Sequence, residues 1–133
     1  MIKGSVKLEH VKGTDRDFLV SKGFWYLDKN FYVRVKKGWI TDGASVPRLF
    51  WNIFPPVAGK YLEAAVLHDA LYKSQRVKRS EADRLFYKAM KDLGVAFWKR
   101  LIIYLAVRIG GWLSWRENKK NLNPDIVFVR RKR

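Results

Sequence analysis

The sequence predicts an α+β fold, in which an amino-terminal antiparallel β-sheet or meander is packed by about three helices. Short segments with alternating apolar residues fill residues 1–40, and longer segments with helical periodicity fill residues 61–116. The chain has 133 residues, of which 48% are hydrophobic, so it is long enough to bury a core without disulfides or metals. We therefore expect one domain over residues 1–133, with an irregular loop at 41–60 and a basic tail at 117–133.

The strand prediction rests on short apolar runs with turn residues between them. The runs at 18–20, 24–27 and 31–35 are rich in aromatic and β-branched side chains, and a looser alternation precedes them at 6–11. Each separating triplet contains a residue that favours turns, and the triplets are residues 21–23, 28–30 and 36–38. Such short spacing predicts hairpins with one packed face and one face in water.

Two adjacent helices are predicted in the middle of the chain. The first spans residues 61–74, and the second begins with Ser80 as its N-cap and stops at Gly94. Only the short basic segment 75–79 lies between them. Helices joined by so few residues are usually antiparallel neighbours, so we expect the two to pack side by side.

The carboxyl-terminal third predicts one more helix and one more strand. Helical periodicity covers residues 95–115, with a break or bend expected at the glycine pair Gly110 and Gly111. The tail that follows is rich in lysine and arginine but contains an apolar run at 126–129. We expect this run to add a last strand to the amino-terminal sheet.

Charge is the strongest compositional signal. The chain carries 28 Lys and Arg against 12 Asp and Glu, which gives a net charge of +16. Such a surface attracts polyanions, so nucleic acid and anionic lipid are the expected partners. The chain has no cysteine, which excludes disulfides and thiolate metal sites and is compatible with a reducing cytoplasm. No signal-peptide pattern or membrane-spanning run is present, and the longest apolar run is residues 101–107.

One constellation in the helical region predicts chemistry. His68 and Tyr72 are four residues apart, so they share one face of the first predicted helix. Asp83 lies near the start of the neighbouring helix, at a level where it could meet His68. A carboxylate on one imidazole nitrogen fixes the tautomer, and the other nitrogen can then take a proton from water. Tyr72 is expected to donate its hydroxyl to Asp83 and to keep that carboxylate ionised.

A second set of polar residues is predicted to bind ions. Asp69 points about 100° away from His68 on the same helix, which leaves it free to bind a hard cation. Asp42 and Gly43, in the preceding loop, are the expected co-ligands. Arg48 and Arg79 are candidates for contact with a substrate or phosphate group, although each could instead pair with an aspartate.

His-Asp-x-x-Tyr on one helix, with an aspartate on the antiparallel next helix, resembles the core of secreted and viral phospholipases A2. The resemblance covers residues 61–90 and implies a calcium-dependent lipid hydrolase with a phospholipase A2-like helix pair. By position, it implies that His68 activates water, that Asp83 and Tyr72 support His68, and that Asp69 binds calcium.

A longer pattern resembles a bacteriophage and prophage family of unknown function. It consists of Thr-Asp-Gly-Ala-Ser-Val-Pro-Arg at 41–48, then His-Asp-x-x-Tyr at 68–72, then Arg-x-x-Ala-Asp at 79–83. The resemblance implies a phage origin and hence a place in the host cytoplasm, in the virion, or peripherally on the inner membrane. Other phage virion proteins are further expected partners.

Several alternatives stay open at this stage. The pair His68 and Asp83 could be a satisfied polar pair that only joins two helices, and Asp42-Gly43 could be an ordinary turn. A serine triad would use Ser45, and a metal phosphohydrolase would need His10 as a further ligand. Residues 97–109 are typical either of an interfacial helix with basic and aromatic anchors or of a plain core helix. The leading hypothesis is a phage-encoded hydrolase acting on anionic lipid, and its competitor is a non-enzymatic virion or nucleic-acid-associated protein.

Overall fold

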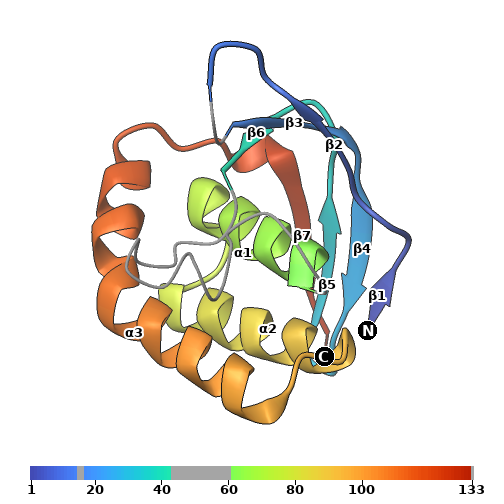
Figure 1. Cartoon of the computed structure of the whole chain (residues 1–133), viewed down its shortest axis with the longest axis vertical. Coiled ribbons are helices and arrows are strands. Elements are labelled where there is room, and N and C mark those ends of the chain that lie inside the picture. The colour runs from blue at the N-terminus through green and yellow to red at the C-terminus, as the bar shows by residue number, and fades with distance from the viewer. Residues whose placement is uncertain (15–16, 43–60, 133) are drawn as a thin grey trace.

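Two antiparallel sheets contain the amino-terminal strands in the computed structural model, which describes residues 1–14, 17–42 and 61–132. The larger sheet has the strand order β1-β4-β5-β7 (Figure 1). Its strands are β1 (Ile2–Lys3), β4 (Phe24–Leu27), β5 (Phe31–Val35) and β7 (Val127–Arg131). The predicted α+β class is therefore confirmed, and so is the last strand, which pairs with β5 along its whole length.

The smaller sheet was not predicted as a separate unit. It contains β2 (Lys7–His10), β3 (Phe18–Lys22) and the two-residue strand β6 (Ile40–Thr41), in the order β2-β3-β6. Only Gly23 separates β3 from β4, and there the chain passes from one sheet into the other. A Cβ atom on Gly23 would lie 2.0 Å from the carbonyl oxygen of Val35, so this crossing requires glycine. Residues 21–23 were interpreted as a hairpin turn, and that prediction is wrong.

The two-residue alternation of the strands divides the larger sheet into an inner and an outer face. Phe24 and Tyr26 of β4, with Phe31, Val33 and Val35 of β5, are each at most 1% exposed and form part of the core. Their sequence neighbours point to the other side of the sheet.

On the inner side of this sheet the described residues form the helices α1 (Leu62–Ser74), α2 (Arg79–Asp92) and α3 (Phe97–Lys119). Figure 1 shows α1 between the larger sheet and α3, and α2 packs against both other helices. Being central, α1 is buried on every side, and its buried residues include the polar His68 and Asp69. A short 3-10 helix, Pro124–Ile126, leads from α3 into β7.

Two details of the helix predictions are corrected. The N-cap of α2 is Lys78 rather than Ser80, because the side chain of Glu81 accepts a hydrogen bond from the backbone N–H of Lys78 at 3.0 Å. The helix α3 runs without a break through Gly110 and Gly111 and continues to Lys119, beyond the predicted end at 115. Gly111 makes room for Tyr72 and Arg79 instead of bending the helix.

Candidate functional site

The structure brings His68, Tyr72 and Asp83 together at the contact between α1 and α2. Nε2 of His68 lies 2.8 Å from Oδ1 of Asp83, and the hydroxyl of Tyr72 donates to the same oxygen at 2.7 Å. The i, i+4 spacing on α1 puts both donors on one face, and the short connection to α2 sets Asp83 opposite them. All three residues have an exposed fraction of 0%.

A third helix completes this cluster with a residue that sequence reasoning missed. Arg108 of α3 donates from NH1 to Oδ2 of Asp83 at 2.7 Å. Arg79 lies 3.7 Å from the same oxygen, and its guanidinium also donates to the carbonyl oxygens of Val107 and Arg108. Arg108 belongs to the segment 97–109, for which the sequence leaves open an interfacial helix with basic anchors or a plain core helix. The available signal was a single cation among apolar neighbours, which is costly to bury unless it is paired.

These partners set opposite protonation states on the two members of the pair. Burial alone would raise the pKa of Asp83, but hydrogen bonds from His68, Tyr72 and Arg108 outweigh it and hold the pKa below its usual value. Burial lowers the pKa of His68 below 6.5, although Asp83 acts in the other direction. At neutral pH the cluster therefore holds a carboxylate beside a neutral imidazole.

The imidazole of His68 is packed between aromatic rings. Its centroid lies 4.2 Å from that of Tyr72 and 4.5 Å from that of Phe86. Gly111 of α3 lies against the hydroxyl of Tyr72, where a Cβ atom would be only 2.5 Å from that oxygen. The outer ring nitrogen, Nδ1, is buried and has no hydrogen-bond partner among the residues that the structure describes. Within the described residues, Nδ1 is thus the ring nitrogen of His68 that makes no hydrogen bond.

Asp69 occupies a different environment on α1, toward the smaller sheet. The hydroxyl of Thr41 in β6 donates to its Oδ2 at 2.6 Å, and Nζ of Lys73 lies 3.6 Å from its Oδ1. Burial raises the pKa of Asp69 to about 7. The nearby charge of Asp42 also raises the pKa, whereas Lys73, Thr41 and the backbone of Asp42 lower it.

The predicted calcium site is only partly within the described chain. Asp69 and Asp42 are close enough to interact, but both oxygens of Asp69 already face donors, and one of these is the cationic Lys73. Residues 1–14, 17–42 and 61–132 contain no group of three or more His, Asp or Glu side chains that could hold a metal ion. A calcium site takes six to eight oxygen ligands, and the two oxygens of Asp69 already face hydrogen-bond or ion-pair donors. The described residues therefore do not form a favourable calcium site.

The other predicted site residues are distributed as follows. Gly43, Arg48 and Ser45 lie outside the described residues. Arg79 is committed to Asp83 and to α3, as the alternative interpretation expected. His10 lies on β2, where its ring packs edge-on against Phe18 with the centroids 5.4 Å apart.

The outer face of α3 is apolar and open to solvent. Only Ile103, Ala106, Val107 and Gly111 of this helix are buried. Large apolar side chains with exposed fractions from 37% to 76% line the opposite side: Phe97, Trp98, Leu101, Ile102, Leu105, Ile109, Trp112 and Leu113. In the described part of the chain, no helix has the length and apolarity needed to cross a bilayer.

Comparison with known proteins identifies relatives of this chain. Residues 18–107 match the family model described as "Protein of unknown function (DUF1353)". The chain is 36% identical over 108 residues to a protein of Sinorhizobium fredii (strain NBRC 101917 / NGR234) described as "Uncharacterized protein y4jT". The match covers 80% of this chain but only 32% of that relative, so the chain spans about a third of its length. No solved structure matches. Because the family model covers both β3–β5 and the helices that hold His68 and Asp83, the chain belongs to the DUF1353 family.

Proposed function

We propose that this chain is a hydrolase that resembles phospholipases A2 and uses His68 to take a proton from water. One observation carries the proposal. Nε2 of His68 contacts Asp83 at 2.8 Å, while its Nδ1 has no partner among the described residues. If Nε2 carries the proton and donates it to Asp83, the lone pair of Nδ1 is free to act as a general base.

The partners of Asp83 support this assignment. An ionised Asp83 stabilises the imidazolium that forms when His68 accepts a proton. Tyr72 and Arg108 keep that carboxylate ionised, since both donate to it at 2.7 Å. The lowered pKa of His68 leaves the imidazole neutral near pH 7, which is the form that a base requires.

The surface of α3 supports lipid as the substrate class. Its exposed apolar residues extend from Phe97 to Leu113, which is roughly 24 Å at the helical rise. A net charge of +16 would draw such a face toward anionic lipid. The same helix supplies Arg108 to Asp83, so a lipid surface against α3 would lie next to the cluster.

The proposal also requires an opening, because His68 has no exposed surface. Water and an ester would have to reach Nδ1, and we propose that lipid promotes this access. Diethyl pyrocarbonate, which modifies accessible imidazoles, should leave His68 unmodified in buffer and modify it when phosphatidylglycerol vesicles are present. His10 is exposed and should react in both conditions, which makes it the internal control.

Calcium at Asp69 and Asp42 stays part of the proposal as the resemblance implies it. No step assigned to His68, Asp83 or Tyr72 depends on it. A phage origin, and action in the host cytoplasm, in the virion or on the inner membrane, likewise rest on the resemblance of the motifs at 41–48, 68–72 and 79–83.

Fatty-acid release from phosphatidylglycerol vesicles, with calcium and with a chelator, tests the activity. We expect wild-type protein to release fatty acid and His68→Ala to lose at least about 100-fold of that rate. The matched control is His10→Ala, which should retain the rate. Undiminished release by His68→Ala would overturn the proposal, and release in the presence of chelator would remove calcium from it.

A second candidate function is a non-enzymatic virion or nucleic-acid-associated protein. The observation that favours it is the complete burial of His68, Tyr72 and Asp83, which suits a polar cluster that joins three helices. In that case no fatty acid is released by well-folded protein, and His68→Ala lowers only the free energy of unfolding.

A further inference from the structure

The outer face of the larger sheet carries a regular arrangement of aromatic and cationic side chains. Trp25 of β4 pairs with Arg34 of β5, and Arg34 pairs with Phe128 of β7. In the next row Tyr32 of β5 pairs with Arg130 of β7. Aromatic and cationic residues thus alternate across the first row and along β5 and β7, while Leu27 of β4 lies opposite Tyr32.

The rings and the guanidinium groups are in contact with one another. Trp25 and Tyr32 meet edge to face with centroids 5.3 Å apart, and Tyr32 meets Phe128 at 6.2 Å. Arg34 lies over the ring of Trp25 at 5.2 Å. The exposed fractions of Trp25 and Phe128 are 42% and 49%, so ring surface remains available to a ligand.

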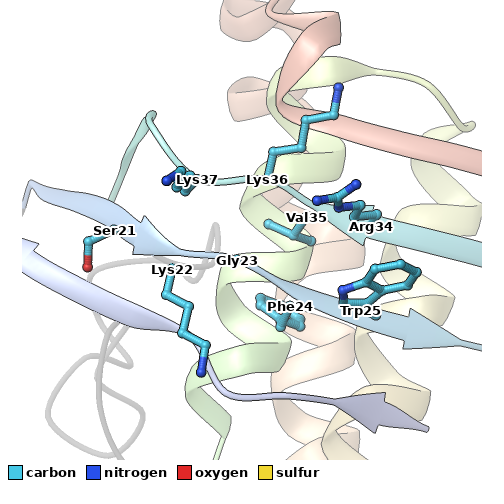
Figure 2. A pocket seen from close by; sticks show the side chains of 9 residues that line it. All are labelled: Ser21, Lys22, Gly23, Phe24, Trp25, Arg34, Val35, Lys36 and Lys37. Atoms are coloured by element: carbon cyan, nitrogen blue, oxygen red, sulfur yellow. The ribbon is translucent and has the colours of Figure 1, made fainter.

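More cations surround an open pocket of about 540 Å³ at the end of this face. Its lining includes Trp25, Arg34, Lys22, Lys36 and Lys37. Figure 2 shows Arg34 beside Trp25, with the side chains of Lys36 and Lys22 extending from the chain in opposite directions. The pocket therefore combines one aromatic ring with four positive charges from two adjacent segments.

We propose that this sheet face binds single-stranded nucleic acid, with bases stacked on Trp25, Tyr32 and Phe128. The phosphates would pair with Arg34, Arg130 and the lysines of the pocket. Exposed rings interleaved with cations are what an unpaired strand requires, because its bases offer free faces and its backbone offers one charge per nucleotide. A duplex hides its base faces, so a stacking surface gives preference to single strands.

A lipid surface fits α3 better than it fits this face. The outer side of α3 carries a row of exposed apolar side chains, whereas on the sheet an arginine lies over the ring of Trp25 and another over the ring of Tyr32. The proposal concerns a different surface from the buried cluster at His68, so it does not depend on the hydrolase activity.

Fluorescence anisotropy of a labelled oligothymidine strand tests the proposal against a duplex of equal length. We expect the strand to bind more tightly than the duplex, and Trp25→Ala to weaken strand binding roughly tenfold. Lys36→Gln combined with Lys37→Gln should make the slope of log affinity against log salt concentration shallower. The expected change corresponds to the loss of about one to two phosphate contacts. The matched control is Trp112→Ala, which removes an equally exposed indole from α3 and should leave strand binding unchanged.

Three results would overturn the proposal. Equal affinity for strand and duplex, unaffected by Trp25→Ala, would mean that charge alone holds the nucleic acid. Loss of strand binding in Trp112→Ala but not in Trp25→Ala would place the site on α3. If the protein binds phosphatidylglycerol vesicles but no oligonucleotide, and Trp25→Ala abolishes the vesicle binding, the face is a lipid site.

Circular dichroism of Trp25→Ala should match wild type, since the side chain lies outside the core.

Discussion

Asp69 of α1 and Asp83 of α2 are both buried carboxylates, yet their pKa values shift in opposite directions. The pKa of Asp83 is lowered, whereas that of Asp69 is raised to about 7. Asp83 receives donors from His68, Tyr72 and Arg108 on two neighbouring helices. Asp69 accepts a hydrogen bond from Thr41 and lies near the more distant Lys73. The negative charge of Asp42 raises its pKa further. Burial raises the pKa at both sites, and only at Asp83 are the hydrogen-bond partners numerous enough to outweigh it.

This difference assigns different tasks to the two carboxylates. A permanently ionised Asp83 can orient His68 and stabilise its imidazolium. Asp69 exchanges its proton near neutral pH, so it responds to pH or to a cation that would replace the proton. The predictions below test the contrast in order of decreasing effect.

Asp83→Asn should have the largest effect. The substitution leaves Arg108 and Arg79 facing a neutral amide, and we expect a loss of about 3 kcal/mol in the free energy of unfolding. Urea denaturation near pH 7 measures it. Asp92→Asn, at the exposed end of the same helix, is the matched control and should cost under about 1 kcal/mol. Equal losses in the two variants would contradict the role given to Asp83.

Asp69→Asn should change how stability depends on pH. With a pKa of about 7 in the folded chain and an ordinary value of 3.8, Asp69 keeps a proton on folding that the unfolded chain has lost. The stabilisation of the folded state that comes from this retained proton is complete below pH 3.8. It is lost as the pH rises toward 7. The variant lacks this decline, so its stability relative to wild type should rise by roughly 3 kcal/mol between pH 4 and 8.

Comparing the two proteins at each pH removes the opposing effect of His68. Its lowered pKa favours the folded state above pH 6.5, and this contribution falls as the pH decreases. Urea denaturation across the range gives the difference directly. A constant difference between wild type and Asp69→Asn would show that Asp69 is ionised throughout.

Gly111→Ala should disturb the Asp83 cluster from α3. Alanine favours helix, but its Cβ atom would lie 2.5 Å from the hydroxyl of Tyr72. We expect a net loss of about 1–2 kcal/mol in the free energy of unfolding. In a Tyr72→Phe background the hydroxyl is absent, so the same substitution should cost less. If the cost is the same in both backgrounds, the close approach to Tyr72 is not its cause.

Lys73→Gln should have the smallest effect. Lys73 lowers the pKa of Asp69 from 3.6 Å, so its removal should raise that pKa further. Carbon NMR of the Asp69 carboxyl group, followed through a pH titration, measures the change. Lys73→Arg keeps the charge and should keep the pKa. Because Lys73 is partly exposed, stability should change by under about 1 kcal/mol.

Local spacing was sufficient to predict the contact between α1 and α2. The four-residue interval from His68 to Tyr72 fixes a shared helical face, and the short connection fixes an antiparallel neighbour that carries Asp83. Both constraints act within about two dozen residues of sequence, so they can be seen without knowledge of the tertiary structure.

Contacts between distant segments could not be predicted in this way. Arg108 is 25 residues from Asp83, and Thr41 is 28 residues from Asp69. Nothing in the local pattern of either residue specifies its partner. The division into two sheets was missed for a related reason, because Gly23 has the composition of a turn but is required by the close approach of Val35. The roles of the site residues in any reaction stay predictions.

The position of β7 has a consequence for the order in which the chain folds. β5 pairs with β4 on one side and with residues 127–131 on the other, about a hundred residues later in the chain. During synthesis the second edge of β5 stays open until those residues have been made, while the helices can already form. An open, aromatic-rich strand edge is a template for pairing between chains. Aggregation of nascent or truncated protein should therefore depend on whether the segment 127–131 is present to close that edge.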